Sequence, residues 1–181
     1  QDEPGAADGD DVFTVGTPAE DPTLYLPVDT PVKFRLRSPD VFERRFQLTR
    51  VGVDLGRQFF FDPRFSMNHD VSCNSCHPLH NYGMDNRGVS IGHLGQTGTR
   101  NAPSVYNAAG HGFQFWDGRA ADVEQQASMP VMDPFEMAMT EERLLQTIRS
   151  IPEYVAELKR LFPEEADPVT LQNFQTVIGS F

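Results

Sequence analysis

The sequence predicts a mostly α-helical domain with long irregular loops and a short N-terminal β extension. Three observations predict this fold class. Apolar residues recur at helical spacing over 51–61 and again toward the C-terminal end. Residues 78–115 are rich in Gly, Asn and His and have little periodicity, which is typical of loops. Apolar and basic residues alternate over 32–37, and a period of two is typical of a β-strand.

Composition excludes several classes of protein. A hydrophobic content of 39% is ordinary for a soluble globular chain, and no stretch approaches the roughly 20 apolar residues of a membrane span, so no membrane span is expected. A net charge of -11 makes nucleic acid an unfavourable partner, because phosphates would be repelled. The two cysteines lie in one short motif, which excludes a disulfide scaffold and a zinc site with four Cys ligands.

The N-terminal 50 residues divide into two parts. Residues 1–22 carry seven acidic residues and no Lys or Arg, which predicts a disordered acidic tail. Residues 23–50 are expected to form the β extension. Within them, 28–48 weakly resembles a cupredoxin strand pair, although Glu43 and Arg44 stand where a copper-ligand His is expected. The segment is therefore either a cupredoxin relic or a β extension packed on the main domain.

The main domain is expected to begin at residue 51, and two helices are predicted in its first part. Apolar residues over 51–61 predict a helix that ends before Asp62. Helical composition returns over 120–127 and is expected to stop near Pro130, since proline interrupts helical hydrogen bonding. The loops between these helices are longer than a compact domain usually carries, which indicates that they fold around a large cofactor.

Three further helices are predicted toward residue 181. Thr140 is expected to cap the first, with acidic residues in its first turn. The second is expected over 152–162. The third is expected to begin with Asp167 as N-cap and Pro168 at its first helical position. Its apolar stripe still runs at Phe181, so we expect the C-terminal end to be truncated or cleaved.

The segment Cys73-Asn74-Ser75-Cys76-His77 is a C-x-x-C-H motif, which is typical of covalent haem c attachment. Thiols three residues apart on a helical turn share one face and can both reach the haem vinyl groups. The following histidine then directs its imidazole at the iron. A thioredoxin-like pair would need a βαβ pattern, and a zinc site would need further soft ligands. Because haem c is attached on the exported side of bacterial membranes, we expect a periplasmic or exported protein.

The ligand on the opposite face of the haem would decide the function. A tightly held ligand makes an electron-transfer haem, whereas a vacant or labile position admits peroxide. His69, His80, His93, His111 and the methionines are candidates. His69 and His80 lie close to the motif in sequence and would not easily reach that face. His93 lies between glycines in a loop that can approach a cofactor closely.

Ordered motifs from residue 51 to residue 181 resemble the N-terminal, peroxidatic domain of the bacterial di-haem cytochrome c peroxidases, a family that includes the MauG branch. The matching segments are Leu55-Gly56-Arg57, Phe60-Phe61-Asp62-Pro63-Arg64, Ser72 to His77, Ser90-Ile91-Gly92-His93, Arg100-Asn101-Ala102-Pro103-Ser104, Gln114 to Ala120 and Phe135-Glu136-Met137. The resemblance implies a cytochrome c-like domain whose long loops wrap one covalent haem c. Cys73, Cys76 and His77 would hold that haem.

The resemblance also implies roles for residues around the haem. His93 matches a distal ligand that leaves on reductive activation. Glu136 matches the carboxylate that assists cleavage of the peroxide O–O bond, and Gln126 matches a glutamine beside it. Trp116 matches a tryptophan between two haems, and Asn101 matches a calcium ligand. A buried carboxyl could have a pKa raised toward the working pH, which suits proton transfer.

The expected function is reduction of hydrogen peroxide, with electrons from a small cytochrome c or copper protein. The family has two haems, whereas this chain has one C-x-x-C-H motif. We therefore expect a second haem domain or subunit. One alternative is a MauG-like oxidase of a partner protein, for which Trp116 would be an outbound relay that passes oxidising equivalents from the haem to the partner. Another is an electron-transfer subunit of a heteromeric complex, with permanent ligation by His77 and His93.

Overall fold

A computed structural model describes residues 32–37 and 43–181 of the chain, with the backbone alone up to residue 48. The acidic tail predicted for 1–22, and the first part of the predicted β extension, lie outside the described residues. The helices are α1 (Arg50–Phe61), α2 (Cys73–Cys76), α3 (Val123–Met132), α4 (Glu141–Arg149), α5 (Pro152–Leu161) and α6 (Leu171–Ser180), with single 3-10 turns at Pro63–Phe65, Leu79–Asn81, His93–Gly95 and Ala108–Gly110. From residue 49 onward the chain has no regular strand, and the fold is mostly helical.

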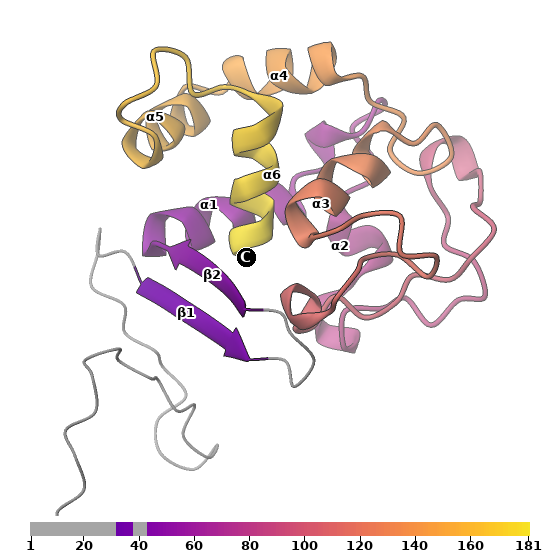
Figure 1. Cartoon of the computed structure of the whole chain (residues 1–181). Helices are drawn as coiled ribbons and strands as arrows, with labels where there is room; N and C mark the ends of the chain where they lie inside the picture. The colour runs from indigo at the N-terminus through magenta and orange to yellow at the C-terminus, as the bar shows by residue number, and fades with distance from the viewer. Residues whose placement is uncertain (1–31, 38–42) are drawn as a thin grey trace, which may run out of the picture.

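Two strands precede α1. β1 (Val32–Arg37) and β2 (Glu43–Leu48) pair in antiparallel register, with Val32 opposite Leu48 and Arg37 opposite Glu43. Figure 1 shows this pair beside the end of α6 and apart from α4 and α5.

Aromatic side chains form the centre of the helical core. α6 packs against both α1 and α3, and α5 also contacts α1. Phe59 stacks on Phe174 with ring centroids 5.5 Å apart, and it meets the edge of Phe65 at 5.1 Å. All three rings are 1% exposed, so each stabilises the fold by roughly 1.5–3 kcal/mol of apolar burial. This core holds α1, α3, α5 and α6 together.

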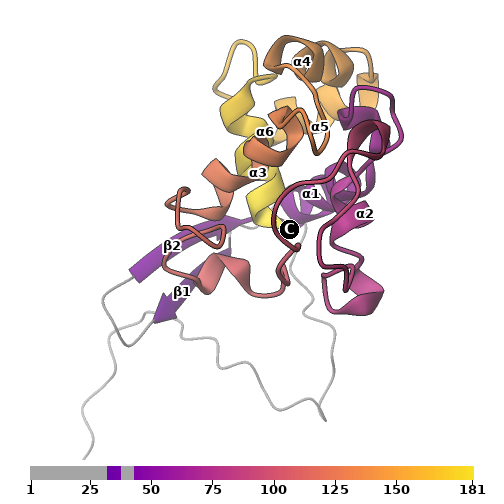
Figure 2. The same cartoon turned by 90° about the vertical axis from the view of Figure 1, so that its right-hand side faces the viewer.

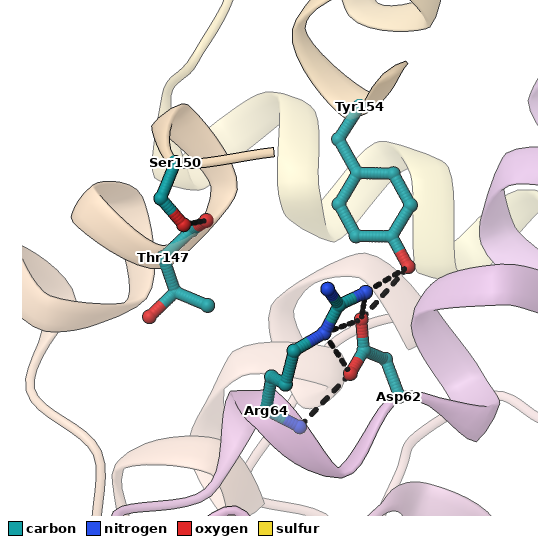
Figure 3. Close-up of polar contacts among 5 residues, drawn as sticks. All are labelled: Asp62, Arg64, Thr147, Ser150 and Tyr154. Atoms are coloured by element: carbon teal, nitrogen blue, oxygen red, sulfur yellow. Dashed lines mark hydrogen bonds and ion pairs between the residues drawn. The ribbon is translucent and has the colours of Figure 1, made fainter. Parts of the chain in front are cut away.

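A buried carboxylate connects the end of α1 to α5 (Figure 3). Asp62 caps the 3-10 turn that follows α1 and forms a bidentate ion pair with Arg64, whose Nη2 lies 2.7 Å from Oδ2. The Tyr154 hydroxyl donates a hydrogen bond of 2.8 Å to the same oxygen. Burial raises the pKa of Asp62, but the hydrogen bonds from Arg64 and Tyr154 outweigh it and hold the pKa below its usual range. The carboxylate is therefore ionised and fully partnered.

Two predicted helix boundaries are wrong. α3 does not stop near Pro130 but continues to Met132, because proline disturbs only the final turn of this helix and the Asp133 N–H still donates to the Met129 carbonyl. α6 is capped by Thr170 and not by Asp167. The Asp167 carboxylate instead accepts the Val169 N–H and pairs with Arg149, which holds the turn ahead of the helix.

The chain between α2 and α3 forms the loop region, which lies to the right of α1 and α6 in Figure 1 and faces the viewer in Figure 2. Its regular pairing within 77–122 consists of two isolated bridges, Ile91 with Thr97 and Gln114 with Ala120. Single hydrogen bonds supply the other links. Among the described residues, no helix has the length and apolar character needed to cross a bilayer.

Candidate haem-attachment site

The helix that carries the two thiols is a single, locally capped turn. The Ser72 N–H donates to Ser75 Oγ at 3.0 Å, and the His77 N–H closes the turn on the Cys73 carbonyl at 2.9 Å. Cys73 and Cys76 are three residues apart in this turn and do not form a disulfide. Two free thiols three residues apart in one helical turn have the arrangement that thioether formation to one macrocycle needs.

The environment of the thiols does not favour redox chemistry of their own. Burial raises the pKa of Cys73 to about 12 and also raises that of Cys76, although Ser90 acts in the opposite direction on Cys76. A reactive dithiol needs a lowered pKa, because the thiolate is the nucleophile. The raised pKa values of the two thiols therefore do not favour the thioredoxin-like alternative.

His77 is oriented by two backbone carbonyls. Its Nδ1 lies 3.1 Å from the Gly83 oxygen and 3.0 Å from the Pro103 oxygen. Carbonyl oxygens only accept, so Nδ1 carries the hydrogen and Nε2 presents its lone pair. Burial lowers the pKa of His77, and the two carbonyls oppose that effect in part. A neutral imidazole with Nε2 free is the form that ligates iron, with the carbonyls as its outer shell.

His93 is the one buried histidine of the described chain, at 8% exposure, whereas His69, His80 and His111 are exposed. Its Nδ1 has no hydrogen-bond partner in the described part of the molecule. Buried polar atoms in proteins are nearly always paired, so an unpaired ring nitrogen points to a partner that is not protein. Of the four candidates for the distal side, His93 alone has this environment.

The His93 turn lies directly against the segment that carries Glu136. The His93 N–H donates to the Glu136 carbonyl at 2.7 Å. A Cβ at Gly92 would lie 2.1 Å from the Phe135 carbonyl oxygen and 2.6 Å from that of Glu136. Both neighbours are backbone atoms that cannot rotate away, so a glycine is needed for this approach. Two of the predicted site residues are thus brought together.

The Glu136 carboxyl is half-buried, and burial raises its pKa, with a further contribution from Asp133. The charge of Arg119 acts in the opposite direction. The negative charge of Glu136 also raises the pKa of both Cys73 and Cys76, which means that the carboxyl lies near the attachment turn. A carboxyl in this environment can hold a proton closer to neutral pH than a solvated glutamate can.

The remaining predicted residues lie around this centre. Gln126 is half-buried on α3. Trp116 is 62% exposed, and its indole N–H donates to the Asn101 carbonyl at 3.1 Å. Asn101 is exposed, and the described residues contain no cluster of three or more His, Cys, Asp or Glu side chains suited to a metal ion. The neighbouring Asp117 pairs with two arginines, Arg100 and Arg119.

Large apolar side chains are exposed throughout the loop region, which a flat apolar cofactor could cover. They are Tyr82, Ile91, Leu94, Tyr106, Phe113 and Trp116, and Phe135 in the turn after α3 is exposed as well. Together with the free Nε2 of His77 and the unpaired Nδ1 of His93, they show that the residues present fit a haem. Sequence reasoning missed the Gly83 and Pro103 carbonyls and the role of Gly92, because loop backbone positions leave no periodic pattern.

Comparison with known proteins agrees with this geometry. The family model described as di-haem cytochrome c peroxidase matches residues 50–181. The cytochrome c551 peroxidase of Pseudomonas aeruginosa is 44% identical over 128 residues, which cover 71% of this chain and 37% of that protein. The methylamine utilization protein MauG of Methylorubrum extorquens is 33% identical over 153 residues, covering 83% of this chain and 43% of that protein.

A solved structure extends the likeness to the fold. A MauG-like protein associated with microbial copper homeostasis superposes with a TM-score of 0.68 at 28% identity, covering 88% of this chain and 44% of that one. The chain thus spans less than half the length of each of these relatives.

Proposed function

This chain belongs to the di-haem cytochrome c peroxidase family, and we propose that it is the haem c domain at which hydrogen peroxide is reduced to water. One observation carries the proposal. The buried imidazole of His93 and the half-buried carboxyl of Glu136 lie on contacting segments beside the turn that presents Cys73, Cys76 and His77.

Haem c, when bound, supplies the electrons and the iron at which peroxide is reduced. Cys73 and Cys76 would anchor it covalently, and His77 would hold the iron through Nε2. His93 would close or open the opposite face. The Glu136 carboxyl would move a proton between the two peroxide oxygens, a transfer that typically contributes 10²–10⁴-fold to rate.

Further parts of the proposal concern what surrounds this domain. Gln126, on α3, would orient the bound peroxide beside Glu136. We expect a second haem domain or subunit, and a small cytochrome c or copper protein as electron donor. A periplasmic or exported location follows from haem c attachment. Asn101 would supply one ligand of a calcium ion, and β1 with β2 would form an extension of the haem domain.

Replacement of Glu136 by Gln tests the proposed proton transfer. The haem-loaded Glu136→Gln chain should consume hydrogen peroxide at least about 100-fold more slowly than wild type, with a small-molecule reductant as electron source. Glu141→Gln is the matched control, because Glu141 is exposed in the first turn of α4, and it should retain the wild-type rate. Equal rates in Glu136→Gln and wild type would remove Glu136 from the mechanism.

A second candidate, oxidation of a partner protein as in the MauG branch, is favoured by Trp116. Its 62% exposed indole could pass electrons from a partner to the haem. Under this candidate, Trp116→Phe should abolish oxidation of the partner and leave peroxide consumption with a small reductant intact. An electron-transfer subunit would behave differently from both. Its reduced visible spectrum should remain unchanged when peroxide or cyanide is added.

A further inference from the structure

We infer that Ser104 and Tyr106 are positioning residues for His77, because they join the two loops whose carbonyls hold its imidazole. The inference rests on the proposed attachment of haem at His77, and it does not depend on which reaction the haem performs.

Neither carbonyl that contacts His77 Nδ1 belongs to a regular element. Gly83 follows the 3-10 turn Leu79–Asn81, and Pro103 lies in an irregular stretch 20 residues further along the chain. The imidazole has one hydrogen on Nδ1 and two acceptors, at 3.1 Å and 3.0 Å. The hydrogen can be shared in this way only while both loops keep their separation.

Three hydrogen bonds join the two loops around this point. Ser104 Oγ donates to the Tyr82 carbonyl at 2.7 Å, and the Tyr106 hydroxyl donates to the Leu79 carbonyl. The Val105 N–H donates to the Gly83 carbonyl at 3.3 Å, the same oxygen that lies against His77. Ser104 Oγ also accepts the Tyr106 N–H at 3.2 Å, so the two side chains act as one clamp.

The loops can approach so closely because position 83 is a glycine. Its φ is +71°, and a Cβ there would lie 2.8 Å from Val105 Cγ2 and 3.1 Å from the Val105 nitrogen. The clamp itself is near the surface, since Tyr106 is 47% exposed and Tyr82 is 73% exposed. Loss of the Ser104 or the Tyr106 hydroxyl would therefore loosen the loops without opening a cavity in the helical core.

The expected consequence is electronic. A hydrogen bond from Nδ1 to a carbonyl raises the basicity of Nε2 and so increases electron donation to iron, which favours the ferric state. A looser clamp weakens that bond. The ferric to ferrous equilibrium should then shift toward ferrous, and the reduction potential should rise.

The test is the reduction potential of haem-loaded Ser104→Ala, Tyr106→Phe and the double variant, measured by spectroelectrochemical titration. We expect a shift of about threefold to tenfold in the ferrous/ferric ratio for the double variant, where tenfold is about 59 mV for one electron. The hydrogen on His77 Nδ1 should also exchange with solvent faster in NMR spectra of the reduced protein.

Two matched variants separate positioning from general loss of structure. Ser150→Ala removes a hydroxyl that donates to the Thr147 carbonyl at 2.7 Å at the end of α4, as Figure 3 shows. Tyr154→Phe removes a hydroxyl bound to Asp62. Both should leave the potential unchanged. Wild-type potential and exchange in the double variant would overturn the inference. Failure of peroxide reduction with a shifted potential would overturn the proposed function alone.

Discussion

Replacement of Tyr154 by Phe should lower the free energy of unfolding by about 1.5–2 kcal/mol. The phenyl ring keeps the contacts that the tyrosine ring makes, including the Phe59 ring at 4.9 Å. The hydroxyl is lost, and with it a 2.8 Å hydrogen bond to the buried carboxylate of Asp62. A hydrogen bond to a charged group contributes about 1.5–3 kcal/mol. The lower part of that range applies because Arg64 still holds both carboxylate oxygens.

The assay is urea unfolding of the haem-loaded chain followed by far-UV circular dichroism, with thermal unfolding as a second measure. A loss of 1 kcal/mol should lower the midpoint temperature by about 2–4 °C in a domain of this size. Tyr82→Phe is the matched control, because Tyr82 is 73% exposed, and it should change stability by less than about 0.5 kcal/mol. A loss below 0.5 kcal/mol for Tyr154→Phe would refute the assigned role of its hydroxyl.

The same variant should have a defined pH dependence. The pKa of Asp62 is held below its usual range in the folded chain, so ionisation of this group stabilises the fold above the unfolded pKa of about 3.9. That stabilisation is lost as the pH falls through the folded pKa. Tyr154→Phe removes one of the groups that lower this pKa. The difference in stability between wild type and variant should therefore be full near pH 6 and shrink below about pH 4.

Two further predictions test the fold around the site. Gly92→Ala should lower thermal stability and speed backbone hydrogen exchange at residues 91–97 and 133–138, because its Cβ would clash with two carbonyl oxygens. Gly98→Ala is the control and should have neither effect, since no atom lies within 4 Å of its Cβ position. Equal effects of the two variants would contradict the assigned contact of Gly92. Thr170→Ala should lower the free energy of unfolding by about 1 kcal/mol through loss of the α6 cap. Asp167→Ala should lower it by less, because the ion pair of Asp167 with Arg149 is exposed. The reverse order in urea unfolding would favour Asp167 as the N-cap, as the sequence predicts.

Sequence patterns predicted the parts of the chain where local chemistry decides the structure. The helix over 51–61 was expected from its apolar spacing, and α1 is observed over Arg50–Phe61. Thr140 was expected as an N-cap, and its hydroxyl accepts the Arg143 N–H. In each case the residues that determine the helix or its cap lie within one or two turns of it, so the local sequence is enough to predict it.

The wrong boundary at α6 has a specific cause. Asp167 followed by Pro168 is a good local helix start, and nothing nearby in sequence argues against it. Arg149, 18 residues earlier, binds both the Asp167 carboxylate and the Val169 carbonyl. That tertiary contact holds 167–169 as a turn and leaves Thr170 to cap the helix. The local preference for a helix start at Asp167 is overridden by Arg149, a contact that no local sequence pattern predicts.

The site divides in the same way. The attachment motif could be read directly, since its chemistry needs residues at fixed short spacing. The groups that orient it could not, because they are carbonyl oxygens, which every residue has, and glycines whose necessity appears only when two loops meet. Gly83 and Gly92 are such positions: Gly83 lies against Val105, and Gly92 lies against Phe135 and Glu136. The segments that these glycines bring together lack regular structure, so the positions of His77 and His93 depend on individual hydrogen bonds, from backbone groups and from the Ser104 and Tyr106 hydroxyls.

This dependence has a physical consequence for how the domain works. The aromatic core formed around Phe59 and Phe174 buries its side chains almost completely, whereas the loop region is held by isolated bonds and exposes most of its large apolar residues. Local opening requires less free energy where few apolar contacts are lost. The His93 turn can therefore shift without disturbing α1 or α6, and because its N–H is bonded to the Glu136 carbonyl, such a shift would also move the Glu136 segment. If His93 ligates the haem and Glu136 transfers the proton, as proposed, a change in ligation and a change in the position of the carboxyl would occur as one event.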